Sequence, residues 1–350
     1  MKKILAIIGA RPQFIKHAPI EIAFQGKAKL VSIHTGQHYD HNMSQIFFDE
    51  LGMAAPKYML EVGSHSHGIQ TGMMMMEIEN IVLEEKPDAI LVYGDTNSTL
   101  AGALVGSKLH IPIIHIEAGL RSFNKKMPEE VNRILTDHVS AMLFVPTQNA
   151  IDNLQKEGIV KNIYLSGDVM KDMINIVKSR SILKDTEDKN QYYYATLHRP
   201  YNTDGKERLA YILGVFNQLE HPVKFPAHPR TRHKMEMFGL SEADYPNVIF
   251  CEPFSYFDNM RQLFNARALI TDSGGMQKEA YWMNKKCVTI RTETEWIETL
   301  HDDWNTLMFE NLSNLGKVIE KKSDNWSNAL YGSGNASEDI IELLLQKLFE

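Results

Sequence analysis

Short apolar runs alternate with stretches of helical pattern along the first half of the chain. Five of these runs have the composition of buried strands, at residues 4–8, 30–34, 89–94, 111–116 and 141–146. Helical patterns follow them from about residue 14 and over residues 68–85, 99–109 and 129–139. Strands that are apolar on both faces and alternate with helices are typical of a parallel sheet covered on both sides.

The helix predicted over residues 68–85 contains a run of four methionines. Ile69, Met73, Met76 and Val82 recur near helical spacing, and Pro87 ends the pattern. We therefore expect these four side chains to face the core, because methionine is more often a packing residue than part of a cofactor site.

The second half of the chain repeats the same alternation. Strands are predicted at residues 192–197, 223–227, 247–251, 268–271 and 287–290, with helices between them. The segment 179–190 is charged and lacks a period, so we place a domain linker just before it or within it. The prediction is two Rossmann-like, doubly wound parallel-sheet domains, residues 1–175 and 176–337, with a final helix over 338–350 that can pack on either one.

Net charge, cysteine content and the lengths of the apolar runs limit the kinds of ligand and partner that the protein can bind. The 350 residues carry a formal net charge of −7, which disfavours nucleic acid as a partner and makes any phosphate site a local pocket. Two distant cysteines, Cys251 and Cys287, form neither a disulfide framework nor a metal knuckle. The first apolar run is too short for a signal peptide, and no apolar stretch has the length of a membrane span. We expect a cytoplasmic protein with no membrane partner.

Ionisable and small polar residues follow one predicted strand after another. Ligands of parallel sheets bind beyond the carboxyl ends of the strands, so these residues are the candidates for a site. Singly, each has an ordinary alternative: Asp95 as a helix cap, Glu129 as a charge on a helix dipole, His198 as a core histidine. Together they favour a ligand cleft between the two domains. The set is Arg11, Lys16, Asp95, Glu117, Arg121, Glu129, Glu130, Arg133, His198, Arg199, His228, Arg230, Asp272, Ser273, Gly274, Gly275 and Arg291.

The turn Ser273-Gly274-Gly275 suits a diphosphate. Glycine lets the backbone approach a ligand closely, and the helix that follows offers free N–H groups. Glu279, one turn further, can accept hydrogen bonds from ribose hydroxyls. No GxGxxG fingerprint follows the first strand, no Walker A sequence occurs, and no His, Cys or Asp cluster has metal-ligand spacing. We expect neither a cofactor nor a metal.

Nine stretches, in order over most of the chain, carry a family resemblance. They are GARPQFIKHAPI (9–20), TGQHYD (35–40), GDTNSTLAG (94–102), HIEAGLRS (115–122), PEEVNRILTDH (128–138), GDVMKD (167–172), HRPYN (198–202), HPRTR (228–232) and DSGGMQKEA (272–280). The set resembles the non-hydrolysing UDP-N-acetylglucosamine 2-epimerases, which have the glycosyltransferase-B architecture.

The resemblance implies a homodimer that interconverts UDP-GlcNAc and UDP-ManNAc. UDP leaves C1, a 2-acetamidoglucal forms, and the two recombine with C2 inverted. Asp95, Glu117 and Glu129 match the family's acid–base carboxylates, and His198 matches a histidine near the diphosphate. The residues expected to bind the UDP-sugar are Arg11, Lys16, Arg133, Arg199, His228, Ser273, Gly274, Gly275, Glu279, Arg291 and Glu298.

Two departures from the family pattern bear on the substrate and on regulation. The tract that usually reads RxTTERPE is RTETEWIE here (291–298), and with GDVMKD it resembles a surface-polysaccharide subgroup. UDP-2,3-diacetamido-2,3-dideoxyglucuronate is therefore the alternative substrate. Gln37, His38 and His228 match part of a second, activating UDP-GlcNAc site, although residues 39–43 differ.

Three other classes compete with the 2-epimerase. A glycosyltransferase of the same architecture usually needs one base, whereas three carboxylates match here. A hydrolysing epimerase usually has a different first loop. A sugar-nucleotide-binding regulator without turnover would have lost a carboxylate, and none of the three is missing.

Overall fold

The computed structural model describes residues 2–37, 48–327 and 329–349. Contacts between Cα atoms divide the chain into two compact units. Unit 1 comprises Met1–Asn175 and Ala329–Glu350, and unit 2 comprises Ile176–Asn328. The division falls within α7 (Val169–Ser179), and each unit is described separately below.

The described part of unit 1 contains a seven-stranded parallel sheet. Its order is β3-β2-β1-β4-β5-β6-β7, so the direction of strand addition reverses between β1 and β4. This is the doubly wound order of Rossmann-like folds. The strands are β1 (Lys3–Ile8), β2 (Lys29–His34), β3 (Tyr58–Met59), β4 (Ala89–Tyr93), β5 (Ile113–Ile116), β6 (Met142–Val145) and β7 (Ile163–Leu165).

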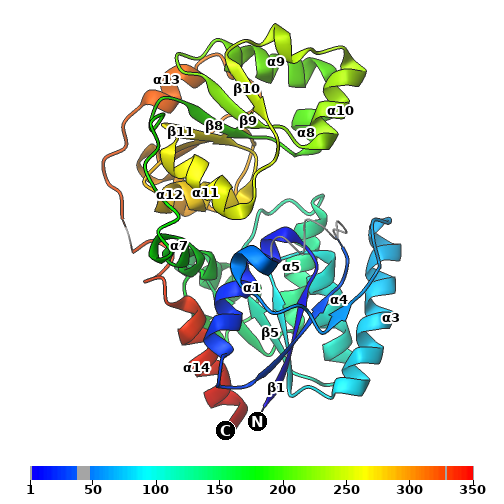
Figure 1. The fold of residues 1–350 in the computed structure, drawn as a ribbon. Helices are drawn as coiled ribbons and strands as arrows, with labels where there is room; N and C mark the ends of the chain where they lie inside the picture. Colours follow the sequence, from blue (N-terminus) through cyan, green and yellow to red (C-terminus); the bar gives the residue numbers. More distant parts are fainter. Residues whose placement is uncertain (1, 38–47, 328, 350) are drawn as a thin grey trace. The chain divides into compact units, whose positions relative to one another are not determined.

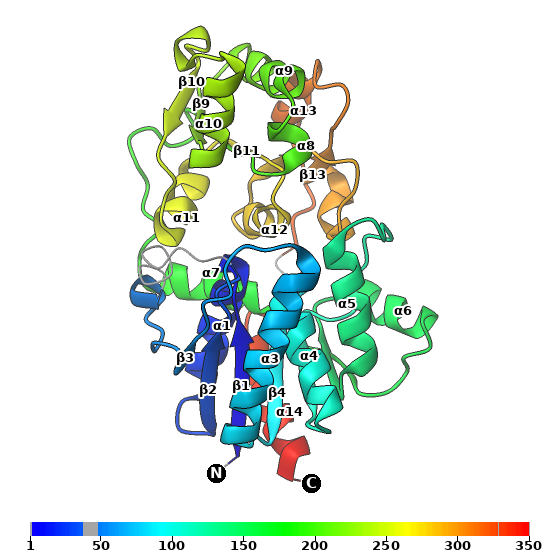
Figure 2. The same ribbon diagram turned by 90° about the vertical axis from the view of Figure 1, so that its right-hand side faces the viewer.

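Helices cover both faces of this sheet. Helices α3, α4 and α5 lie side by side on one face, and α1 and α14 pack together on the other (Figures 1 and 2). The C-terminal helix α14 therefore belongs to unit 1. The helices are α1 (Arg11–Phe24), α3 (His67–Glu85), α4 (Asn97–Lys108), α5 (Pro128–Val139), α6 (Gln148–Lys156), α7 and α14 (Ala336–Phe349).

The methionine run in α3 packs differently from the sequence-based expectation. Met74 and Ile78 are fully buried, whereas Ile69, Met73 and Met76 are exposed. The buried face of α3 is instead formed by Met74, Ile78, Ile81 and Val82, which pack in one core cluster with residues of β1, β2 and β4. Of the four expected core residues only Val82 is buried, so this prediction was largely wrong.

Helix α1 begins earlier than predicted. Arg11 lies in its first turn rather than in a loop, and Pro12 follows directly. Proline suits the first turn because its missing N–H would have no helical partner there. The Gln13 side chain accepts hydrogen bonds from the N–H groups of Gly9 and Ala10, at 2.8 and 3.1 Å, which stabilises this early start.

Unit 2 repeats the topology of unit 1. Its six described strands are all parallel in the order β10-β9-β8-β11-β12-β13, which reverses between β8 and β11. The two parallel-sheet α/β domains predicted from sequence are thereby confirmed. The strands are β8 (Tyr193–Thr196), β9 (Val223–Pro226), β10 (Val248–Cys251), β11 (Ala268–Thr271), β12 (Lys286–Thr289) and β13 (Asn305–Leu307).

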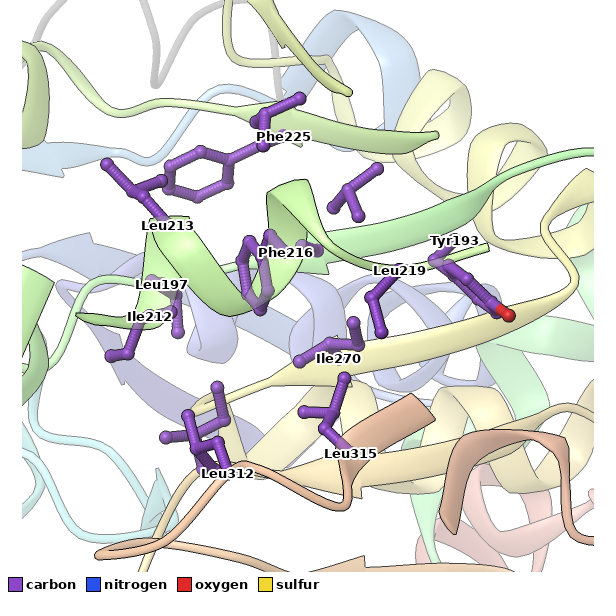
Figure 3. Packing of buried hydrophobic residues seen from close by; sticks show 14 of the residues in the cluster. Tyr193, Leu197, Ile212, Leu213, Phe216, Leu219, Phe225, Ile270, Leu312 and Leu315 are labelled. Atoms are coloured by element: carbon purple, nitrogen blue, oxygen red, sulfur yellow. The ribbon is translucent and has the colours of Figure 1, made fainter. Parts of the chain in front are cut away.

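The core of unit 2 joins helices to the central strands. Phe216 of α9 packs with Phe225 of β9 and Ile270 of β11, and Leu315 of α13 lies in the same cluster (Figure 3). No described helix combines the length and apolarity needed to cross a bilayer. The helices of unit 2 are α8 (Pro200–Thr203), α9 (Lys206–Asn217), α10 (Pro229–Phe238), α11 (Tyr256–Asn265), α12 (Gly274–Trp282) and α13 (Leu315–Glu320), with short 3₁₀ turns at Glu242–Asp244 and Ile297–Asp303.

A buried carboxylate attaches α14 to unit 1. Asp172 of α7 accepts hydrogen bonds from the N–H groups of Ala336 and Ser337, at 3.1 and 2.6 Å, and from the Ser337 hydroxyl. These amides belong to the first turn of α14, where they have no helical acceptor. Asp172 therefore acts as an N-cap supplied by another helix.

We expect Asp172→Ala to lower the free energy of unfolding by about 1–2 kcal/mol, the usual cost of losing an N-cap. Hydrogen exchange should quicken first in the amides of α14. Asp339→Asn is the matched control, because it removes an exposed carboxylate from the same helical turn. Equal effects of the two substitutions would contradict the capping role.

Candidate active site

The loops at the carboxyl ends of β1, β4 and β5 carry the candidate residues of unit 1. Because these strands are parallel neighbours, Gly9, Asp95 and Glu117 emerge at the same edge of the sheet. The edge between β1 and β4 is the point at which the strand order reverses, where doubly wound sheets bind ligands.

Lys16 and Glu117 form an ion pair at this edge, with side chains only 9% and 7% exposed. The pair lies against Gly94, where an added Cβ would come within 3.1 Å of Glu117 Oε2 and 3.2 Å of Lys16 Nζ. Gly94 has φ +62° and Glu117 has φ +68°. A left-handed backbone is costly for glutamate, so the surroundings must hold Glu117 in place.

Arg133 connects two carboxylates of the same edge. One end of its guanidinium binds Asp95, and the other donates to Glu130 Oε2 at 2.6 Å. Asn132 also donates to the backbone oxygen of Asp95, at 3.0 Å. Asp95 keeps 31% of its side chain exposed, whereas Arg133 is buried. The arrangement orients a partly accessible carboxylate with a buried cation.

Glu130, a candidate from the sequence to which no role was assigned, pairs with Arg133. Its carboxylate is buried and accepts from the N–H groups of Ser122 and Phe123, at 3.0 and 2.9 Å, as well as from Arg133. Its spacing of three residues from Arg133 on one helix could have shown the pairing. Glu129, the predicted acid–base group, lies beside it in the first turn of α5 and is half-buried.

Of the residues that match the activator site, Gln37 lies at the first turn of α4. The Gln37 side chain accepts hydrogen bonds from the N–H and hydroxyl of Ser98, at 3.0 and 2.7 Å, in the first turn of α4. His38 lies outside the described residues. Gln37 is therefore engaged within its own unit.

His198 and Asp272 pair at the corresponding edge of unit 2, after β8 and β11. Nδ1 of His198 lies 2.9 Å from Oδ1 of Asp272, and the imidazole is 52% exposed while the carboxylate is fully buried. Asp272 also accepts from the N–H of Arg199 and from Asn202 Nδ2, both at 3.0 Å. Burial raises the pKa of Asp272, but these donors and the charge of His198 outweigh it and the pKa is lowered.

The first turn of α12 carries the predicted phosphate turn. Ser273 is its N-cap residue, and Gly274 and Gly275 open the helix. A Cβ on Gly274 would lie 2.6 Å from Oε1 of Glu295, whose other oxygen is 3.0 Å from Arg291 Nη2. A carboxylate thus rests where a helix N-terminus favours an anion. Sequence reasoning missed Glu295.

The remaining candidates of unit 2 lie at several places. Glu279 is buried on α12 and accepts from the Tyr256 hydroxyl at 3.3 Å. His228 is the exposed N-cap of α10, and Glu298 lies in the 3₁₀ turn Ile297–Asp303. Within the described ranges, no cluster of three or more His, Cys, Asp or Glu side chains could hold a metal ion.

Comparison with known proteins identifies the family. The family model for UDP-N-acetylglucosamine 2-epimerase matches residues 21–345. The chain belongs to the UDP-N-acetylglucosamine 2-epimerase family. It is 48% identical to a UDP-N-acetylglucosamine 2-epimerase homolog of Methanococcus maripaludis, covering 98% of this chain and 99% of the relative. It is also 46% identical, with the same coverage, to the UDP-2,3-diacetamido-2,3-dideoxy-D-glucuronate 2-epimerase of Pseudomonas aeruginosa.

A solved 2-epimerase structure matches the whole chain. The crystal structure of Methanocaldococcus jannaschii UDP-GlcNAc 2-epimerase, in complex with UDP-GlcNAc and UDP, is similar with a TM-score of 0.89 and 40% identity. The match covers 99% of this chain and 100% of that one. The family resemblance and the enzyme class predicted from the sequence are confirmed.

We expect Asp272→Asn to lower the free energy of unfolding by about 1–3 kcal/mol near neutral pH, because buried donors lose a charged acceptor. Folding lowers the pKa of Asp272 from its ordinary value of 3.8, so its carboxylate stabilises the fold above that value. This stabilisation is lost as the pH falls through the lowered pKa. Denaturant unfolding of both proteins should show a difference that shrinks in acid; a difference independent of pH would contradict the role.

Proposed function

We propose that this 2-epimerase family member interconverts UDP-GlcNAc and UDP-ManNAc by inverting C2, without a redox cofactor. The observation that carries the proposal is the pair of cation-bound carboxylates, Asp95 with Arg133 and Glu117 with Lys16, at one edge of unit 1. Inversion at carbon needs one group to remove a proton and another to return it to the opposite face. Two oriented carboxylates meet that requirement.

The chemistry explains why unit 2 presents phosphate-binding groups. The C2 hydrogen is not next to a carbonyl and is barely acidic, so the bond between C1 and oxygen breaks first or together with deprotonation. UDP departs with the bonding electrons, the C2 proton passes to a carboxylate, and 2-acetamidoglucal remains. Return of a proton to the other face of C2, with attack of UDP oxygen on C1, completes the inversion. Donors beside the departing diphosphate stabilise its charge.

Each predicted residue has a place in this proposal. Asp95, Glu117 and Glu129 are the acid–base groups, and His198 acts beside the diphosphate. The Ser273 hydroxyl and the amides of Gly274 and Gly275 bind phosphate. Arg291, which contacts Glu295 at 3.0 Å in this structure, releases that carboxylate and binds the ligand. Glu279 binds the ribose. The other proposed substrate-binding residues are Arg11, Lys16, Arg133, Arg199, His228 and Glu298.

The sugar substituents at C3 and C6 define the second candidate substrate. The Pseudomonas aeruginosa relative is named for a 2,3-diacetamido uronate and is nearly as similar as the first relative. The tract that departs from the family pattern is packed within unit 2, where Lys278 Nζ lies 3.5 Å from the ring centroid of buried Trp296. UDP-2,3-diacetamido-2,3-dideoxyglucuronate is the alternative that this departure favours.

Proton NMR in D₂O tests the function and the substrate together. With UDP-GlcNAc, we expect deuterium at C2 and a growing UDP-ManNAc signal. Release of free ManNAc would indicate the hydrolysing branch instead. Exchange only with UDP-2,3-diacetamido-2,3-dideoxyglucuronate would establish the alternative, and exchange with neither would contradict both.

We expect Asp95→Asn and Glu117→Gln each to lower kcat by at least about 100-fold, the lower end for loss of an acid–base group. UDP affinity should persist, because the proposed nucleotide contacts belong to unit 2. Asp152→Asn, which removes an exposed carboxylate of α6, is the control and should change neither quantity. Near-full turnover in either variant would refute its assigned role, and loss of UDP binding in both would indicate a structural one.

A homodimer located in the cytoplasm, and activation by a second UDP-GlcNAc through Gln37 and His38, stay predictions.

A further inference from the structure

A buried histidine lies directly beneath the loops that carry Asp95 and Glu117. His115 of β5 is fully buried, and its Nδ1 lies 2.7 Å from Oδ1 of Asp137 on α5. Its Nε2 lies 2.8 Å from the backbone oxygen of Gly94. A carbonyl oxygen can only accept a hydrogen bond, so Nε2 carries a proton. His115 therefore ties the loop after β4 to helix α5.

Asp137 holds the other loop through its second oxygen. Oδ2 accepts from Arg121 Nη1 at 2.7 Å and from the N–H of Gly119 at 3.2 Å. Arg121 in turn makes two contacts of 2.7 Å with Glu157. Burial raises the pKa of Asp137, but His115 and Arg121 outweigh it, and the pKa is lowered. The other oxygen of Asp137 lies 2.7 Å from His115 Nδ1, so one carboxylate joins His115 to Arg121 and to the Gly119 loop.

These contacts fall on both sides of the proposed acid–base groups. Gly94 immediately precedes Asp95, and His115 and Gly119 flank Glu117 by two residues each. The backbone is left-handed at Gly94, Glu117 and Gly119. At Gly119 an added Cβ would lie 2.5 Å from the Ala150 backbone oxygen, so this turn packs tightly. A backbone in this region persists only where neighbouring groups hold it.

We propose that His115 is a positioning residue for the epimerisation, which orders the Asp95 loop through the Gly94 carbonyl and the Glu117 loop through Asp137. The inference rests on the proposed function. Being fully buried, His115 takes no proton from a substrate itself. A misplacement of about 1 Å in an acid–base group can cost about 100-fold in rate, so such ordering is worth as much as a direct contact.

Two substitutions at one position separate the two hydrogen bonds of His115. Asparagine places its amide near the position of Nδ1, so His115→Asn keeps a donor to Asp137 and loses the bond to Gly94. Glutamine places its amide near the position of Nε2, so His115→Gln keeps the bond to Gly94. We expect His115→Asn to lower kcat by about 10- to 100-fold with unchanged UDP affinity. His115→Gln should lower kcat less, by under about tenfold, because Arg121 and the Gly119 N–H still hold Asp137 when its bond to His115 is lost.

A control and a second variant keep the test decisive. Glu157→Gln breaks the outer ion pair of Arg121 and should lower stability slightly without changing kcat. Asp137→Asn is assayed as well, in case His115→Asn does not fold, and should lower kcat at unchanged UDP affinity. The positioning role would be overturned if both His115 variants lost kcat equally and in proportion to their drop in melting temperature. Wild-type kcat in folded Asp137→Asn would overturn it as well.

Amide hydrogen exchange separates this proposal from the proposed function. Residues 94–97 should exchange faster in His115→Asn than in wild type or His115→Gln, whether or not a substrate turns over. Absence of turnover in wild type would refute the function alone. Unchanged exchange in these residues would refute the positioning role alone.

Discussion

A buried aspartate paired with a histidine organises the carboxyl edge of the sheet in each unit. Asp137 pairs with His115 in unit 1, and Asp272 pairs with His198 in unit 2, through the same two atoms at 2.7 and 2.9 Å. Both carboxylates are fully buried and also accept backbone N–H groups from the loops. A buried charge is tolerated only when its partners are complete, so the loops that supply them are held in one conformation.

The two pairs differ in the exposure of the histidine, and this difference separates their roles. His198 is half-exposed at its sheet edge, where an imidazole can meet a ligand, whereas His115 is enclosed and can act only through its neighbours. The same chemical pair thus supports a proposed ligand contact in one unit and a proposed positioning contact in the other. In both units the strand order reverses beside these loops, which explains why the topology brings the candidate site residues there.

Much of the fold was predictable because both sheets consist of buried parallel strands. Such strands appear as continuous apolar runs, and the residue after each run is a candidate site residue, as at Asp95, Glu117 and Asp272. Partners across elements were not predictable. Only tertiary packing brings the side chain of Glu295 to Gly274 and the side chain of Glu130 to Ser122. The buried face of α3 was misjudged because its apolar residues are more numerous than one face can bury. Tertiary packing buries Met74 and Ile78 and leaves Met73 and Met76 exposed.

Cleavage of the bond between C1 and the bridging oxygen of UDP is the step on which the proposed roles of both units depend. UDP-GlcNAc labelled with ¹⁸O in that bridge, followed by ³¹P NMR during turnover, tests it directly. If UDP departs and returns, the terminal phosphate rotates and the label moves into non-bridging positions of the β-phosphate. Deuterium entering C2 while all of the label stays in the bridge would contradict elimination with free rotation of the departed phosphate.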